Sequence, residues 1–245
     1  MTTRTAAHLV IGNELLSGKI QDANTLTLAN TLRPLGIALR RVVVVPDEVA
    51  LIAAEANALR ATHDYVFTSG GVGPTHDDVT VEALAHALGR RVVRSPEIES
   101  LLRAHYGDAL TDGHLCMANI VEGTRLHSGL DPKWPTMVLG NVFVLPGVPE
   151  IYRYKLDGLL GLLRGDDAPF VTHRVYLDRD EGALKPYLDA VVQAFADVAV
   201  GSYPRWRDPE YSVMVTFDGR DEARVIAALQ HFVAAVPEGS VLRTS

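Results

Sequence analysis

The sequence predicts an α/β protein with a three-layer, mostly parallel sheet and helices on both faces, followed by a small α+β C-terminal domain. Two observations lead to this fold class. Short apolar runs alternate with longer segments whose apolar residues recur at helical spacing, and glycine-rich turns follow several of the apolar runs. Buried strands separated by amphipathic helices are typical of a parallel sheet with right-handed crossovers.

The first part of the chain supplies three strand and helix repeats. A strand is expected around residues 8–11, and a helix over 24–35 ends at Gly36. The next elements, in order, are a strand at 39–45, a helix with Val49, Ile52, Ala53, Ala56 and Leu59 on its apolar face, a strand at 65–67, and a helix from Val79 with Val81, Leu84, Ala85 and Leu88 on its apolar face.

Beyond Gly89 the alternation is less regular. Pro96 begins a helix, and residues 108–135 are rich in glycine, aspartate and proline without a clear period, so a loop or lid is expected there. A strand at 141–145 then leads through a tight turn to a helix near 151–163, for which Pro149 suits the first helical position.

A linker is expected at residues 163–169, so that the domains cover residues 1–165 and 170–245. The second domain is too small for another doubly wound sheet. Its expected elements, in order, are a strand at 171–177, a helix around Leu184 to Phe195, strands near 198–202 and 211–217, a helix around Val225 to Phe232, and an edge strand at 241–244.

Composition excludes several classes of function. The chain has 245 residues, a formal net charge of −7 and no basic stripe, so no nucleic-acid partner is expected. No apolar segment is long enough to span a membrane, and no membrane partner is expected. The single cysteine, Cys116, allows neither an internal disulfide nor a multi-cysteine zinc site, which fits the cytoplasm.

The most informative segment runs from Thr68 to Asp78, between a strand and a helix. Its glycines let backbone N–H groups approach a ligand, and the helix start that follows favours phosphate. Carboxylates repel phosphate unless a divalent cation lies between them, so a phosphorylated ligand with a metal such as magnesium is expected. The candidate residues are Ser69, Gly70, Gly71, Gly73 and Thr75 for the ligand, and Asp77 and Asp78 as catalytic metal ligands.

Two further loops follow strands in the same way and are expected beside the first. One carries Gly12 and Glu14, with Asp22 and Asn24 just beyond, and Glu14 could hydrogen-bond the N–H groups of a heterocycle. The other carries Pro146, Gly147 and Pro149.

Each loop also has a purely structural explanation. Asp22 and Asn24 are ordinary helix-capping residues, Thr75 and Asp78 match a capping box, and the proline turn at 146–149 could simply be rigid. Walker, dinucleotide and zinc-protease motifs are absent.

These residues carry a family resemblance. Ile11 to Gly18, Thr68 to Thr80 and Val144 to Glu150 resemble the amino-terminal domain of the competence/damage-inducible protein CinA, in the order of that family. That domain is similar to the molybdopterin-binding MoaB/MogA fold and to the amino-terminal domain of eukaryotic FAD synthase. Residues 201–204 resemble a motif of the small second domain in the same group. The resemblance implies a nucleotide- or pterin-binding domain over residues 1–165.

The resemblance further implies a homo-oligomer whose partner is a small-molecule nucleotide or molybdopterin. CinA-like domains are similar to metal-dependent pyrophosphatases that act on ADP-ribose or FAD, so a divalent metal is expected, with potassium as a further candidate ion. Two other functions remain open from the sequence. One is molybdopterin binding or transfer in cofactor synthesis, and the other is a non-catalytic interaction module. Deamidation is not expected, because no amidase domain follows.

Overall fold

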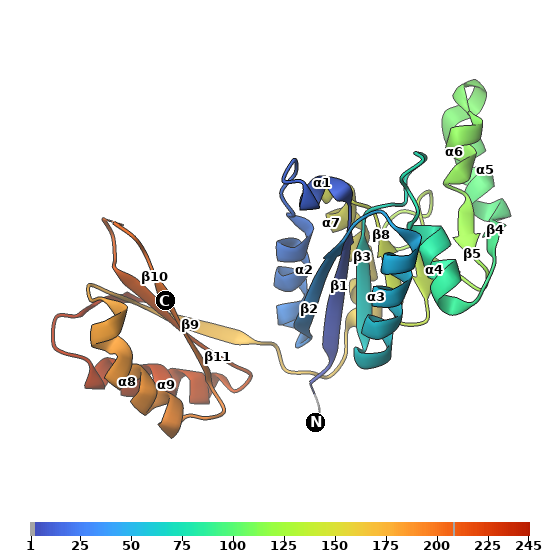
Figure 1. The fold of residues 1–245 in the computed structure, drawn as a ribbon. Coiled ribbons are helices and arrows are strands. Elements are labelled where there is room, and N and C mark those ends of the chain that lie inside the picture. The colour runs from blue at the N-terminus through green and yellow to red at the C-terminus, as the bar shows by residue number, and fades with distance from the viewer. Residues whose placement is uncertain (1–2, 208) are drawn as a thin grey trace. The chain divides into compact units, whose positions relative to one another are not determined.

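The computed structural model describes residues 3–207 and 209–245, and the chain divides into two compact units, Met1–Asp167 and Ala168–Ser245 (Figure 1). Among the described residues, none of the helices has both the length and the apolar character needed to cross a membrane. The first unit contains, in order, β1 (Thr5–Ile11), α1 (Asn13–Leu16), α2 (Asn24–Leu32), β2 (Ala38–Val45), α3 (Val49–Thr62), β3 (Tyr65–Ser69), α4 (Thr80–Leu88), β4 (Val92–Arg94), α5 (Pro96–Tyr106), α6 (Asp112–Cys116), β5 (Asn119–Val121), β6 (Arg125–His127), β7 (Thr136–Leu139), β8 (Val142–Leu145) and α7 (Pro149–Leu163).

The main sheet of the first unit has the strand order β2-β1-β3-β8-β7-β6. The pairs β1 with β2, β1 with β3, and β3 with β8 are parallel, which confirms the expected mostly parallel sheet. The strands β7 and β6 continue the sheet in antiparallel pairing. The carboxyl ends of β1, β3 and β8 therefore meet at one edge of the sheet.

Helices cover both faces of this sheet, so the unit has three layers. On one face, Ile52 and Leu59 of α3 and Leu84 of α4 pack against alternate residues of β1. On the other face, Leu28 of α2 and Tyr152 of α7 pack against Phe67 and Phe143 of the central strands. The apolar residues that predicted α2, α3 and α4 are the ones that these two cores bury.

Three local expectations need correction. The segment 108–135 is not only loop or lid, because it contains α6, β5 and β6, and β5 pairs with β4 in a separate two-stranded sheet. The loop after β1 includes the short helix α1. The helix expected over 24–35 is α-helical only to Leu32 and ends as a 3-10 turn at 33–35, where Pro34 lacks an N–H for an α-helical hydrogen bond.

A four-stranded antiparallel sheet forms the second unit, in the order β10-β11-β9-β12. Its helices pack on this sheet through a core that includes Leu184, Val191, Val225 and Phe232. The elements are β9 (Val171–Leu177), α8 (Glu181–Ala194), β10 (Ala199–Pro204), β11 (Val213–Gly219), α9 (Glu222–Ala235) and β12 (Val241–Thr244).

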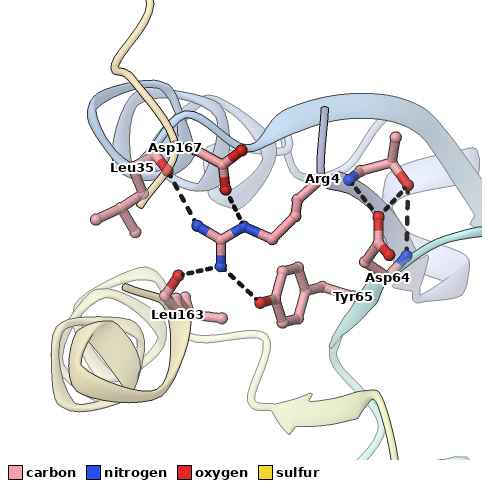
Figure 2. A network of polar contacts seen from close by, with 7 residues as sticks. Arg4, Leu35, Asp64, Tyr65, Leu163 and Asp167 are labelled. Carbon is pink, nitrogen blue, oxygen red and sulfur yellow. Dashed lines mark hydrogen bonds and ion pairs between the residues drawn. The ribbon is translucent and has the colours of Figure 1, made fainter. Parts of the chain in front are cut away.

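Arg4 joins distant segments at the edge of the first unit where β1 begins (Figure 2). Its guanidinium donates to the Tyr65 hydroxyl and to the carbonyl of Leu163, both at 2.8 Å, and it forms an ion pair with Asp167. A longer hydrogen bond of 3.4 Å reaches the carbonyl of Leu35. This one side chain therefore ties the start of β1 to β3, to the end of α7 and to the chain that follows α7.

Replacing Arg4 with glutamine is expected to lower the free energy of unfolding of the first unit by about 2 kcal/mol, because the carboxylate of Asp167 and two backbone carbonyls lose a charged donor. Urea unfolding followed by Trp134 fluorescence in a Trp206→Phe background measures this unit, since the chain has two tryptophans. The exposed Arg40→Gln is the matched control. Equal stability of the two variants would contradict the role of Arg4.

Candidate functional site

A cavity of about 870 Å³ lies at the sheet edge where β1, β3 and β8 end. Its lining includes most of the residues expected from sequence, namely Glu14, Asp22, Asn24, Ser69, Gly70, Gly71, Gly73, Asp78, Pro146, Gly147 and Pro149. Three other expected residues, Gly12, Thr75 and Asp77, do not line it. The structure thus brings the three predicted loops together around one cavity.

The glycine-rich loop connects β3 to α4, as the sequence predicts. Gly70 has φ +103°, and a Cβ atom there would lie 2.2 Å from the carbonyl oxygen of Ile11. Gly71 has φ +65°, and its Cβ would lie 2.3 Å from the hydroxyl of Thr80. These two glycines are therefore required by close packing of the loop against β1 and α4, whether or not a ligand is bound.

Hydrogen bonds within the protein already use part of the loop's backbone. The Gly70 N–H donates to the carbonyl of Leu145 at 3.2 Å, and the Gly73 N–H donates to the Asp78 carboxylate at 2.7 Å. Within the described residues, the N–H groups of Gly71 and Val72 have no acceptor. Among the loop residues that line the cavity, the backbone donors left for an anion are consequently those of Gly71 and Val72.

Asp78 stabilises the loop rather than capping a helix. Its carboxylate accepts from the Gly73 N–H, from the Thr75 N–H at 2.8 Å and from the Thr75 hydroxyl. The helix α4 begins after Val79, which makes no side-chain cap, so the capping-box interpretation of Thr75 and Asp78 is wrong. Interaction with the Thr75 side chain lowers the pKa of the exposed Asp77 carboxyl group.

Asp22 and Asn24 hold the start of α2 against the neighbouring loops. Asp22 accepts from the N–H groups of Asn24 at 2.9 Å and of Thr25 at 3.1 Å. Asn24, a helical residue that is almost fully buried, donates through its side-chain amide to the Ser69 hydroxyl and to the Gly147 carbonyl, both at 2.8 Å. Asn24 therefore links the loops after β1, β3 and β8.

Glu14 and the proline turn complete the predicted part of the site. A Cβ atom on Gly12 would lie 2.4 Å from the Glu14 carboxylate, so glycine makes room for that side chain. Pro149 is at the first turn of α7, as predicted, and Gly147 packs with its Cβ position 3.4 Å from the Cα of Gly70. The turn at 146–149 thus lies directly against the glycine-rich loop.

Sequence reasoning missed Lys155, which lines the cavity from α7. Its ammonium group donates to the carbonyls of Trp134 at 2.8 Å and Pro135 at 3.1 Å. Burial lowers the pKa of Lys155 to about 8, although Asp131 opposes this shift. A signal was present, because Lys155 follows Tyr152 by three residues and so shares the buried face of its helix.

An apolar part of the lining was also missed. It comes from α5, from β7 and from the segment between them, and consists of Ile98, Tyr106, Met117, Trp134, Pro135 and Met137. Met117, Trp134 and Pro135 lie in the segment 108–135, which was expected only as a loop or lid because its sequence has no clear period.

The described residues do not by themselves form a complete metal cage. In the part of the chain that the structure describes, no three histidine, cysteine, aspartate or glutamate side chains are grouped to hold a metal ion. The carboxylates that line the cavity are Glu14, Asp22, Asp78 and Asp131. Magnesium commonly binds through one or two carboxylates and the phosphates of its substrate, so this donor set fits a metal that is bound together with a diphosphate.

Comparison with known proteins agrees with this division of the chain. Residues 7–164 match the family model described as a probable molybdopterin binding domain, and residues 169–245 match the middle domain of FAD synthase. A protein of Archaeoglobus fulgidus is 32% identical over 91% of this chain and 93% of its own length.

Two further relatives carry informative names. A probable FAD synthase of Caenorhabditis elegans is 31% identical over 88% of this chain, which spans 46% of that longer protein. The crystal structure of CinA from Thermoplasma acidophilum, described as having unknown function, is 30% identical with a TM-score of 0.61, and the match covers 66% of this chain and all of that one. The chain therefore belongs to the molybdopterin-binding-domain family that includes the CinA-like proteins, and its second unit is of the FAD synthase middle-domain type.

Proposed function

We propose that this protein is a metal-dependent pyrophosphatase that hydrolyses a nucleotide diphosphate such as FAD or ADP-ribose in the cavity of the first unit. The observation that carries the proposal is one cavity that combines backbone donors at Gly71 and Val72, the cation of Lys155 and several carboxylates. Its volume of about 870 Å³ lies in the range of nucleotide-sized sites.

The chain's own groups have complementary tasks in this reaction. The N–H groups of Gly71 and Val72 and the ammonium of Lys155 would offset the negative charge of the diphosphate. Glu14 would accept hydrogen bonds from the N–H groups of the attached ring. A divalent metal, when bound, would supply further charge neutralisation and orient water. Water attacks one phosphorus and the bridging P–O bond breaks, so each product keeps one phosphate.

The assignment of Asp77 and Asp78 as metal ligands stays a prediction, and the structure makes the two residues unequal. Asp78 lines the cavity but is already hydrogen-bonded within the loop, whereas Asp77 is exposed and outside the lining. A loss of activity in Asp78→Asn could therefore arise from the loop. Asp77→Asn leaves the hydrogen bonds of Asp78 in place and is the cleaner test of metal binding.

Purified protein is expected to hydrolyse FAD or ADP-ribose only when a divalent metal is added, and Asp77→Asn is expected to lower kcat/KM by roughly 100-fold. Products are measured by chromatography with magnesium, manganese or cobalt, with and without potassium. Asp108→Asn, an exposed change that lies neither in the glycine-rich loop nor in the cavity lining, is the control and should keep full activity. Full activity of a folded Asp77→Asn, Asp78→Asn double variant would contradict the metal assignment.

A second candidate is favoured by the family match over residues 7–164, namely a protein that binds or transfers molybdopterin. It predicts tight binding of molybdopterin without cleavage of diphosphates. Calorimetry with molybdopterin beside the hydrolysis assay separates the two functions. If neither class of ligand raises the melting temperature in the presence of magnesium, a non-catalytic interaction module is the better description.

A further inference from the structure

The strand order places the loop of Gly71 and Val72 between two different walls of the cavity. This loop follows β3, which lies between β1 and β8, and β7 lies beyond β8. Glu14 follows β1, on one side of the loop. Met137 of β7 pairs with Val144 of the antiparallel β8, so the start of β7 lies at the same edge of the sheet, on the other side of the loop.

The distance between these walls suits a ligand that extends in both directions from a central diphosphate. Neighbouring strands lie about 4.8 Å apart, so the three spacings from β1 to β7 amount to about 14 Å. The backbone donors of Gly71 and Val72 belong to the loop that follows β3, the strand next to β1, and Lys155 lines the cavity from α7. A diphosphate held there has room for a group at each of its two ends.

The wall beside β7 is mainly apolar and aromatic, and the charged Asp131 and Lys155 lie at the turn that carries Trp134. Tyr106 and Trp134 line this wall together with Ile98, Met117 and Met137. The other wall carries the carboxylates of Glu14 and Asp22. The two walls are therefore suited to different chemical groups, a polar heterocycle edge at one and the face of a flat ring at the other.

Contacts within the protein hold both aromatic rings in place. Tyr106 stacks on His114, with ring centroids 3.9 Å apart and an angle of 13° between the planes. His105 lies edge-on to Trp134 at 5.5 Å. Lys155 fixes the backbone of the same turn through the carbonyls of Trp134 and Pro135. A ring-binding surface that is already ordered loses little conformational freedom when a ligand arrives.

We propose that Tyr106 and Trp134 form a second ring-binding subsite, which makes the protein selective for a diphosphate that carries a flat ring at each end. The inference rests on the proposed function, because it places the diphosphate at Gly71 and Val72. It goes beyond that function by choosing between its two named substrates. FAD carries a flat isoalloxazine ring beyond the diphosphate, whereas ADP-ribose carries only a sugar there.

FAD and ADP-ribose are a matched pair of probes, since they share the adenosine diphosphate part. Stacking of one ring on an aromatic side chain typically changes affinity between about 5-fold and 150-fold. The intact protein is therefore expected to bind FAD at least about 5-fold more tightly than ADP-ribose. Trp134→Ala is expected to remove most of this preference by weakening FAD alone.

Affinities for both probes are measured by calorimetry on the full chain, with calcium in place of magnesium to suppress turnover. Trp134→Phe keeps a ring and should retain the preference for FAD. Tyr106→Leu tests the subsite a second time, should Trp134→Ala fail to fold. In a Trp206→Phe background, quenching of the remaining tryptophan, Trp134, reports whether FAD lies beside this residue. The control variant is Trp206→Ala, which changes an exposed tryptophan of the second unit.

The outcomes separate this inference from the proposed function. Loss of FAD affinity in Trp134→Ala or Tyr106→Leu, with ADP-ribose affinity within twofold of the original, supports the second subsite. Equal affinity for the two probes, or equal losses of both in the variants, overturns the subsite while the proposed function stands. Absence of binding by either probe overturns both.

Discussion

Gly70→Ala is expected to lower the free energy of unfolding of the first unit by roughly 4 kcal/mol, through backbone strain and overpacking. Gly70 has φ +103°, which side chains rarely adopt, and the added Cβ would lie 2.2 Å from the carbonyl oxygen of Ile11. The atom that it meets is backbone in the central strand β1, so it cannot move aside as a flexible side chain would. Any shift of the loop also strains the hydrogen bond between the Thr80 hydroxyl and the Gly70 carbonyl.

The matched control is Gly18→Ala. Gly18 also has positive φ, +71°, but nothing lies within 4 Å of its Cβ position, so only the left-handed backbone conformation is penalised, by about 1 kcal/mol. Urea unfolding of both variants measures the difference, and binding of FAD and ADP-ribose to the folded fraction measures the site. If Gly70→Ala were as stable as Gly18→Ala, the close approach to β1 would not constrain the loop.

The close packing at Gly70 changes the functional interpretation of the glycine-rich loop. From the sequence, three glycines in four positions suggested backbone donors for a phosphate. In the structure, Gly70 and Gly71 are explained by close packing, and Gly73 lies with its Cβ position 2.7 Å from the Asp78 carboxylate. The glycines shape the loop. The backbone N–H groups left for a ligand are those of Gly71 and Val72, and the composition of the loop did not single out Val72.

Regular periodicity explains how much of the fold could be predicted. The strands β1, β3 and β8 are almost entirely buried and the helices α2, α3, α4 and α7 each bury one clear face, which the residue pattern records, whereas β2 is an edge strand in which only Val45 is buried. The strands β6 and β7 are only 3 and 4 residues long and pair antiparallel, so they carry too few residues for a period. Their place in the sheet follows from tertiary pairing alone.

The same distinction applies to the site. Loops that directly follow predicted strands could be placed beside one another, because parallel strands end at one edge. Trp134 and Lys155 could not be placed beside these loops in the same way, since Trp134 precedes an antiparallel strand and Lys155 lies within a helix. Their meeting depends on the hydrogen bonds from Lys155 to the carbonyls of Trp134 and Pro135, which no local pattern encodes.

A buried polar chain beneath the cavity leads to the second large effect. His8 of β1 is fully buried, with Nε2 3.2 Å from the Tyr152 hydroxyl and Nδ1 2.9 Å from the Thr25 hydroxyl. The Thr25 hydroxyl donates to Asp22, so it accepts from Nδ1–H, and Tyr152 donates to Nε2. Both ring nitrogens of a neutral histidine are thereby satisfied, and a second ring proton on Nε2 would take away the acceptor of the Tyr152 hydroxyl proton.

The folded protein is therefore expected to lose stability as the pH is lowered, because of His8. Burial lowers its pKa from 6.5 to about 4, although the charge of Asp22 opposes the shift. Between these two pH values the unfolded chain binds the proton and the folded chain does not. Lowering the pH therefore stabilises the unfolded state relative to the folded state. The loss in the free energy of unfolding is absent well above pH 6.5, grows below that pH, and reaches about 2.5 kcal/mol near pH 4.5.

His8→Gln removes the titrating group, so its stability should depend less on pH over this window even though it loses hydrogen bonds at neutral pH. Urea unfolding from about pH 7.5 to about pH 4.5 gives the wild-type minus variant difference, which should change by about 2.5 kcal/mol. The exposed His86→Gln is the control, and its difference from wild type should stay constant. A constant difference for His8→Gln as well would show that the folded protein accommodates a charged His8, and the hydrogen-bond directions assigned from Tyr152 to Asp22 would then be wrong.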